Sequence, residues 1–189
     1  MSVVAALQPV VEALERLGIA YLVGGSVASS AHGSPRSTND VDVVVELRHE
    51  HVEPLCAALA TAYYAPTELM HDAIDHQSCA NVLHLATGFK VDLFVRGDGD
   101  YDRAAMGRNV DRQLEPNTRM FRLATAEDTL LRKLLWFRKG GEVSDRQWSD
   151  VLGVLRLQKA ELDDGYLHGW SRRLGVDDLL AKAEREIDG

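Results

Sequence analysis

The segment from Asp40 to Val45 reads Asp-Val-Asp-Val-Val-Val, and it constrains the fold more than any other part of the chain. Its β-branched residues predict a strand. On a strand, Asp40 and Asp42 leave the same face with their Cβ atoms about 7 Å apart, while the valines turn to the opposite face and enter a core. Paired carboxylates of this kind suit Mg²⁺, which takes oxygen ligands. The alternative is an edge strand whose acidic face is simply solvated.

Apolar patterns around this segment predict further strands and helices. Apolar side chains recur every three or four positions before Gly18, which is typical of an amphipathic helix. Two apolar runs flank Gly88, which indicates a hairpin that extends the sheet. The elements expected in this part are a helix over 3–18, a strand over 19–23, a helix over 49–62, a hairpin over 81–87 and 89–95, a short helix and an irregular strand within 101–117, and a strand over 119–123.

The last third of the chain changes to a helical pattern. Ser144 followed by Gln147 fits the start of a helix, and Asp163 is a suitable N-cap for the next one. The helices expected here cover 126–138, 144–157, 163–174 and 176–187. The sequence therefore predicts an α/β (α+β) core over 1–123 and a helical region over 124–189 that packs on the core.

The charge balance restricts the partners that the chain can bind. Lys and Arg number 21 against 29 Asp and Glu, so the net charge is −8. A protein this acidic lacks the general positive field that attracts nucleic acid, so an RNA partner needs a local basic cleft. The dense basic cluster of the sequence consists of Arg132, Lys133, Arg138 and Lys139.

The composition also favours a cytoplasmic protein with no membrane partner. No apolar stretch is long enough to cross a bilayer, and the first residues lack the basic segment of a secretory signal. Cys56 and Cys79 are too few for a disulfide scaffold, so we expect both to be reduced thiols.

A third carboxylate, Asp92, interrupts the apolar strand expected over 89–95. An unpaired charge is costly to bury, so Asp92 needs a cation. Lys90 on the same strand face is one candidate, and a metal ion shared with Asp40 and Asp42 is the other. The residues alone leave both open.

The triplet Gly24-Gly25-Ser26 follows the strand expected over 19–23 and precedes a short helix. Glycines let a ligand approach the backbone closely, and the free N–H groups of a helix start, with the hydroxyl of Ser26, form a cradle for an anion such as phosphate. Turn geometry alone is the other interpretation. Its position one short helix before the carboxylate pair favours phosphate.

Taken together, Gly25-Ser26, Asp40-x-Asp42 and the later Asp92 resemble the signature of the DNA polymerase β-like nucleotidyltransferase superfamily. The resemblance covers roughly residues 20–95. The wider pattern Arg36-x-Thr38-x-Asp40-x-Asp42 looks like the bacterial branch that includes the AbiEii/AbiGii-type and MenT-like toxins.

Two later segments resemble the same branch more loosely. Glu127 to Leu134 looks like a helix that carries a basic residue of the nucleotide site, with Lys133 as the matching lysine. Ser144 to Asp150 looks like a reduced form of a last motif, because Gln147 and Trp148 stand where the branch has Arg-x-Lys-Asp. Spacing within this segment favours an ordinary ion pair between Arg146 and Asp150 along one helix.

The resemblance implies both a fold and a reaction. The fold is a polymerase β-like nucleotidyltransferase sheet with flanking helices and a C-terminal helical bundle. The reaction transfers a nucleoside monophosphate from an NTP, such as ATP, to a hydroxyl and releases pyrophosphate. The implied catalytic residues, which would also bind two Mg²⁺ ions or alternatively Mn²⁺, are Asp40, Asp42 and Asp92. The implied nucleotide-binding residues are Gly25, Ser26, Arg36 and Lys133.

The acceptor hydroxyl stays open at this point. The leading expectation is a component of a toxin–antitoxin system that acts on tRNA, with a cognate antitoxin or toxin protein as partner. The alternatives are a protein adenylyltransferase of the antitoxin type and a nucleotidyltransferase for a small molecule such as an antibiotic. A catalytically silent binding partner with the same fold is the non-enzymatic alternative.

Overall fold

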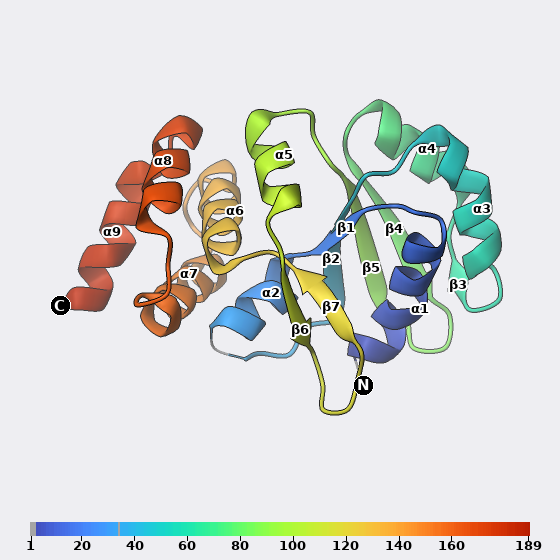
Figure 1. Ribbon diagram of the computed structural model, residues 1–189, viewed down its shortest axis with the longest axis horizontal. Coiled ribbons are helices and arrows are strands. Elements are labelled where there is room, and N and C mark those ends of the chain that lie inside the picture. The colour runs from blue at the N-terminus through green and yellow to red at the C-terminus, as the bar shows by residue number, and fades with distance from the viewer. Residues whose placement is uncertain (1–2, 34) are drawn as a thin grey trace. The chain divides into compact units, whose positions relative to one another are not determined.

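The computed structural model describes residues 3–33 and 35–189, and Figure 1 shows its helices and strands. Contacts within the chain divide it into two compact units. The first comprises Met1–Gly24 and Thr38–Leu123, and the second comprises Gly25–Ser37 and Ala124–Gly189. The second unit thus includes a segment that the sequence-based division assigns to the α/β core.

A mixed sheet forms the centre of the first unit. Within the described residues it has seven strands, in the order β3-β4-β5-β2-β1-β7-β6. The pairs β2–β5 and β1–β7 are parallel, and the other neighbours are antiparallel. The strands are β1 (Tyr21–Val23), β2 (Asp40–Val45), β3 (Tyr63–Tyr64), β4 (Cys79–His84), β5 (Lys90–Val95), β6 (Val110–Gln113) and β7 (Met120–Leu123).

Strand β2 lies in the middle of this sheet and alternates between its two faces. Val41, Val43 and Val45 are fully buried, while Asp40 and Asp42 lie on the less buried face. Burial of the valines fixes the register, because a slip by one residue would exchange the two faces and bury the carboxylates. The predicted strand is therefore confirmed, as a central strand and not as an edge strand.

Helices cover the first unit around this sheet. Helix α1 packs on β2 and β5, and helix α4 packs on β4 and β5. The helices of the unit are α1 (Val3–Arg16), α3 (His49–Leu59), α4 (Thr67–Asp75) and α5 (Asp100–Gly107).

Most elements of the first unit lie where the sequence predicts them, with one exception. The predicted hairpin consists of antiparallel strands β4 and β5, and Gly88 in its turn has φ +69°, a left-handed conformation that glycine adopts without strain. The segment 63–75, in contrast, forms β3 and α4, which the sequence does not predict. Helix α4 has nine residues and buries Met70 and Ala73, which are three apart, so its buried stripe covers a single turn.

The second unit is helical. Its members are α2 (Gly25–His32), α6 (Ala126–Lys139), α7 (Asp145–Gln158), α8 (Asp164–Leu174) and α9 (Asp177–Asp188). Helix α2 packs against α6 and α7. Gly33 permits this packing, because a Cβ atom there would lie 2.8 Å from the carbonyl oxygen of Ser29 and 3.0 Å from the backbone nitrogen of Val154.

The predicted helix starts of this unit are confirmed. The Ser144 hydroxyl accepts a hydrogen bond from the Gln147 N–H at 3.3 Å, and the Asp163 carboxylate accepts one from the Tyr166 N–H at 2.9 Å. Each cap satisfies a backbone donor that the first turn of a helix leaves unpaired. Within the described ranges, no helix combines the length and the apolarity that a membrane span requires.

Candidate active site

Carboxylates from two neighbouring strands share one face of the sheet. Strands β2 and β5 run parallel, with Asp42 paired to Asp92 and Asp40 paired to Lys90. Residues in register on adjacent strands point to the same face, and so do residues two apart on one strand. The fold therefore gathers the three aspartates that the sequence singles out. We call this set, Asp40, Asp42 and Asp92, the acidic face.

Asp92 is the most buried member of the acidic face, with 9% of its surface exposed. Its Oδ2 lies 3.2 Å from the Lys90 Nζ, and its Oδ1 accepts a hydrogen bond from the Asn81 Nδ2 at 2.5 Å. The hydrogen bond to Asp92 raises the pKa of Lys90. Lys90 is therefore the cation that neutralises Asp92 in this structure, which is one of the two alternatives that the sequence leaves open.

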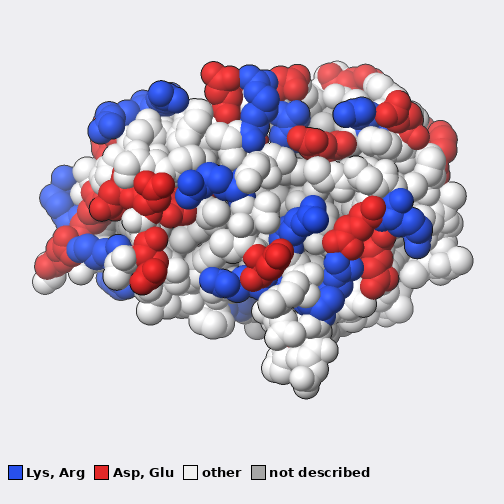
Figure 2. Space-filling view, viewed as in Figure 1, with Lys and Arg blue, Asp and Glu red and all other residues white. Residues whose placement is uncertain are grey.

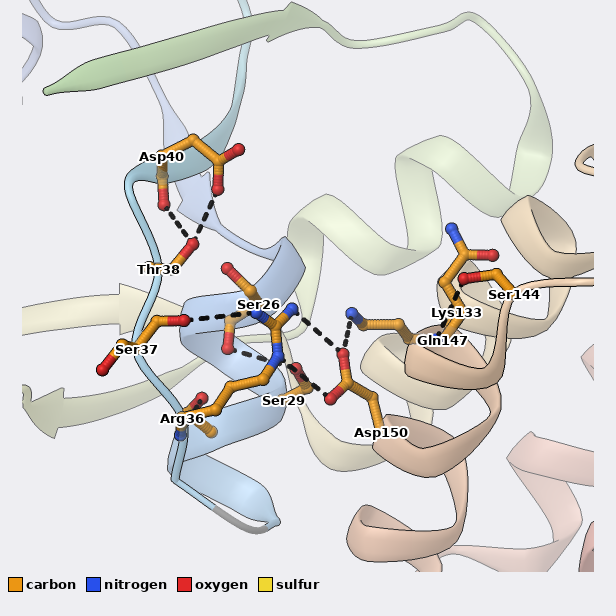
Figure 3. Close-up of polar contacts among 11 residues, drawn as sticks. Ser26, Ser29, Arg36, Ser37, Thr38, Asp40, Lys133, Ser144, Gln147 and Asp150 are labelled. Atoms are coloured by element: carbon orange, nitrogen blue, oxygen red, sulfur yellow. Dashed lines mark hydrogen bonds and ion pairs between the residues drawn. The ribbon is translucent and has the colours of Figure 1, made fainter.

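A threonine before β2 holds Asp40. The Thr38 hydroxyl contacts the Asp40 Oδ1 at 2.7 Å and the Asp40 carbonyl oxygen at 3.1 Å (Figure 3). A hydroxyl has one proton to donate, so it selects between these two acceptors. The contact restricts the rotamers of Asp40 at the point where the chain enters the sheet.

The donor chemistry of the acidic face suits a hard divalent cation. Carboxylate oxygens are the ligands that Mg²⁺ and Mn²⁺ take. The pKa of the neighbouring Cys79 thiol is raised to about 12, mainly by burial and also by the negative charges of Asp92 and Asp42. The thiol is therefore protonated at neutral pH in this structure. Within the described residues, however, no group of three or more His, Cys, Asp or Glu side chains is arranged to hold a metal.

The glycine triplet connects β1 to helix α2 directly. The Gly24 N–H donates a hydrogen bond to the Asp42 carbonyl oxygen at 2.8 Å, which ties this turn to β2. Gly25 begins α2 with φ +56°, a conformation that disfavours residues with a Cβ. Ser26 follows on the first turn with 6% of its surface exposed. The glycine at position 25 is thus required by the backbone, independently of any ligand.

The two basic residues that the sequence assigns to the nucleotide lie together in the second unit. Asp150 on α7 joins them: Lys133 Nζ lies 2.5 Å from its Oδ2, and Arg36 donates to both carboxylate oxygens at 3.2 and 3.3 Å (Figure 3). The side chains of Lys133 and Asp150 are 12% and 9% exposed. Burial alone would raise the pKa of Asp150, but the hydrogen bonds from Lys133 and Arg36 outweigh it and lower that pKa.

This arrangement corrects the ion pair expected along α7. Asp150 pairs with Lys133 and Arg36, whereas the helical spacing predicts Arg146 as its partner. Arg146 is exposed. Residues four apart on a helix can meet, yet two partly buried cations from other segments offer Asp150 a better-shielded interaction than one solvated arginine.

Two of the four residues in the dense basic cluster of the sequence form ion pairs. Lys133 pairs with Asp150, and Arg138 contacts Asp178 at 2.6 Å and Glu142 at 2.9 Å. Lys139 lies over the Trp136 ring, 5.0 Å from its centroid. Figure 2 likewise shows Lys and Arg side chains interspersed with Asp and Glu on the visible face.

Asn81, a partner of the acidic face, is the residue that the sequence reasoning misses. It lies on β4 in register with Asp92 and donates to that carboxylate. One signal could have indicated it, because Asn81 is a polar residue at the start of an apolar run of the predicted hairpin, opposite the strand that carries Asp92. A polar side chain in such a place needs a partner across the pair.

The folding pattern has counterparts among solved structures. The solution structure of the antibiotic-resistance factor ANT(2'')-Ia matches with a TM-score of 0.58 at 10% identity, over 97% of this chain and 95% of that chain. An antigenic nucleotidyltransferase-like protein from Paracoccidioides brasiliensis matches with a TM-score of 0.51 at 16% identity, over 94% of this chain and 90% of that chain. No protein-family profile and no curated protein matches the sequence. The likeness confirms the predicted fold, a nucleotidyltransferase-like α/β sheet with helices.

Proposed function

We propose that this chain is a metal-dependent nucleotidyltransferase that moves a nucleoside monophosphate from an NTP to a hydroxyl acceptor. The observation that supports this most is the acidic face: three carboxylates from β2 and β5 on one side of a sheet with a nucleotidyltransferase fold. A fold alone does not specify a reaction, so the proposal depends on these side chains.

The reaction forms one bond and breaks one. The acceptor oxygen attacks the α-phosphorus, and the bond from that phosphorus to the bridging oxygen of pyrophosphate breaks. Two bound Mg²⁺ ions, or Mn²⁺ ions, would neutralise the triphosphate and lower the pKa of the acceptor hydroxyl. In the proposal Asp40 and Asp42 hold both ions, and Asp92 holds one and accepts the proton of the acceptor.

Lys90 and Asn81 prepare Asp92 for this role in the proposal. Lys90 supplies a positive charge to a carboxylate that would otherwise be costly to bury, and its side chain is 45% exposed, so it can swing away when a cation binds. Asn81 donates to the other oxygen and fixes the orientation of the carboxylate. Asn81 is thus a positioning residue.

The proposed nucleotide-binding residues are Gly25, Ser26, Arg36 and Lys133. The N–H groups at the start of α2 suit phosphate oxygens, and Arg36 and Lys133 supply positive charge. Asp150 holds both cations in defined positions. In the proposal, the phosphate oxygens of a bound triphosphate compete with the Asp150 carboxylate for the hydrogen bonds that Arg36 and Lys133 donate.

The ion pairs within the basic cluster favour a small acceptor over tRNA. Binding of RNA relies on unpaired cations that replace the counterions of phosphates. Here Arg138 is engaged by Asp178, and Lys133 is assigned to the nucleotide in this proposal. One of the structural neighbours that match along nearly the whole chain is an antibiotic-resistance factor. We therefore propose a small hydroxylated molecule as the acceptor, in place of the tRNA that the resemblance to toxins implies.

Label transfer tests this proposal. The protein is incubated with each α-³²P-labelled NTP and Mg²⁺, together with aminoglycoside or lincosamide antibiotics, total tRNA, or cell protein. We expect Mg²⁺-dependent label on a small molecule, abolished by Asp42→Asn and retained by Asp111→Asn, an exposed carboxylate on edge strand β6. Label on tRNA or protein would identify the toxin-like or protein-modifying alternative. No label on any acceptor, despite bound nucleotide, would indicate the silent binding partner.

A further inference from the structure

One face of the sheet stays accessible at the strands that carry the acidic face. The residues of the other face are buried in the core: Val43 on β2, Leu93 on β5, Val82 on β4 and Tyr63 on β3. The Tyr63 hydroxyl donates a hydrogen bond to the Ala6 carbonyl oxygen of α1 at 2.8 Å, so α1 lies on that buried side. Because side chains alternate along a strand, the neighbours of these buried residues point to the opposite, accessible face.

Two apolar residues extend this accessible face toward the edge of the sheet. Lys90 on β5 is in register with Asp40 on one side and with Leu83 on the other. Leu83 on β4 is in turn in register with Tyr64 on edge strand β3. Register partners on adjacent strands point to the same face, so Leu83 and Tyr64 lie on the same side of the sheet as the three carboxylates. We call these two residues the apolar extension.

The apolar extension is accessible and lies close to Asp92. Tyr64 is 60% exposed, and Leu83 is partly buried. Leu83 is a diagonal neighbour of Asp92 across β4 and β5, at about 7–8 Å, and Tyr64 lies one strand further away, at about 12 Å. An exposed aromatic ring at a short distance from polar side chains is typical of sites that bind small molecules.

We propose that the apolar extension binds the acceptor of the nucleotidyl transfer and selects an amphiphilic small molecule, an inference that rests on the proposed function. An apolar ring of this acceptor packs on Leu83 and Tyr64, and its hydroxyl reaches Asp92. There the hydroxyl oxygen forms a bond to the α-phosphorus, pyrophosphate leaves with the electrons of the broken bond, and Asp92 takes the proton. The spacing fits two linked rings, because one ring covers the apolar extension while the other carries the hydroxyl.

Charge complementarity adds an amine to the description of the acceptor. Among the described residues of β2, β4 and β5, the accessible face carries the three carboxylates of the acidic face against one cation, Lys90. The charges of the proposed metal ions and of the triphosphate largely cancel each other, so the excess of negative charge persists when both are bound. An ammonium group on the acceptor is therefore attracted to this face, whereas an anionic acceptor is repelled.

Binding of an acceptor probe is tested first on the full chain without nucleotide or Mg²⁺, by titration of ¹H–¹⁵N chemical shifts. The probe is phenyl β-glucosaminide, which combines an aromatic ring, an amine and hydroxyls. We expect shifts at and beside Leu83 and Tyr64. Tyr64→Thr should raise the Kd of the probe about fivefold, the loss expected for an aromatic contact. Glucosamine, which lacks the aromatic ring, and phenyl β-glucoside, which lacks the amine, should each bind more weakly than the probe.

Three further variants serve as controls for this titration. Tyr64→Phe retains the ring and should bind the probe like the wild type. Met120→Thr is the matched control for Tyr64→Thr, because it introduces the same residue at a strand position that is 54% exposed on β7. Leu83→Thr, on the neighbouring strand, should weaken binding in the same direction as Tyr64→Thr, so a folding defect in one variant does not decide the outcome.

Transfer kinetics then separate the acceptor site from the proposed reaction. With α-³²P-labelled NTP, Mg²⁺ and the same probe, Tyr64→Thr should raise the KM for the probe about fivefold. The KM for the nucleotide and kcat should stay near the wild-type values. No binding of the probe, shifts centred away from Leu83 and Tyr64, or an equal Kd in Tyr64→Thr and Met120→Thr would overturn the acceptor site without touching the reaction. Shifts at the apolar extension with no transfer from any NTP would refute the reaction and retain the binding site.

Discussion

Asp42 and Asp92 are register partners on the adjacent parallel strands β2 and β5. Neighbouring strands are about 4.8 Å apart, and like charges directly opposite each other destabilise a sheet. The structure offsets this repulsion with Lys90, which pairs with Asp92, and with Asn81, which donates to it. We propose that these two facing carboxylates, which repel each other, are present because they bind metal ions.

Removing the lysine should make the stability of the protein depend on Mg²⁺. Lys90→Met leaves Asp92 buried without its cation, so the free energy of unfolding in EDTA should fall by about 1 kcal/mol. Millimolar Mg²⁺ should restore most of this loss, because the metal would replace the lost charge. Urea unfolding with and without Mg²⁺ measures both effects. Lys159→Met, which removes an exposed ion pair with Asp188, is the control. Its free energy of unfolding should differ from that of the wild type by the same amount in EDTA and in Mg²⁺.

Asn81→Ala should lower the rate of nucleotidyl transfer by about tenfold, in the range typical of residues that orient metal ligands. Asp92 keeps its charge but loses the hydrogen bond that orients it, so kcat should fall more than KM for the nucleotide changes. The Mg²⁺ concentration for half-maximal rate should rise. Cys79→Ala, an adjacent change on the same strand face, should leave both quantities near the wild-type values. An equal loss in both variants would indicate a packing defect.

Asp150 should stabilise the second unit in a pH-dependent way. Its folded-state pKa is lowered, so its contribution is fully present above the unfolded value of about 3.9 and is lost as the pH falls through the folded value. Asp150→Asn leaves Lys133 and Arg36 without their carboxylate and should cost about 2–3 kcal/mol at pH 7. The difference from wild type should persist to about pH 4 and shrink below it. Asp145→Asn, an exposed change on the same helix, is the control.

Gly25→Ala should destabilise the protein because of the backbone conformation at this position. Gly25 has φ +56°, and a residue with a Cβ in that conformation costs about 1–2 kcal/mol. Gly107→Ala provides the comparison, because that glycine has open space around its missing Cβ and should change stability by less than about 0.5 kcal/mol. Thermal unfolding of the two variants measures the difference, and equal melting temperatures would contradict the expected strain.

Local patterns in the sequence account for most of the elements. The alternation in β2, the glycine in the β4–β5 turn and the caps at Ser144 and Asp163 each act over a few residues, so the sequence alone indicates them. Strand β3 and helix α4 were not predicted, because no local pattern of this kind indicates them. Strand β3 has two residues, and it is its pairing with β4 that defines it.

The sequence predicts which residues form the candidate site, but it does not predict which residues they contact. Asp40, Asp42 and Asp92 stand out because charges interrupt apolar strands. Their register depends on β5 pairing with β2, a contact between strands that are distant in the sequence. For the same reason the partner of Asp150 was misassigned, since Lys133 and Arg36 come from segments that approach α7 only in the folded unit.

Binding of Mg²⁺-nucleotide to the acidic face is the central claim, and calorimetry tests it without knowledge of the acceptor. ATP, GTP, CTP and UTP are titrated with Mg²⁺ into wild type, Asp42→Asn and the control Asp111→Asn. We expect at least one nucleotide to bind the wild type and the control equally, and to bind Asp42→Asn at least about tenfold more weakly. Folded wild-type protein that binds none of the four, or Asp42→Asn that binds as well as the control, would contradict the account.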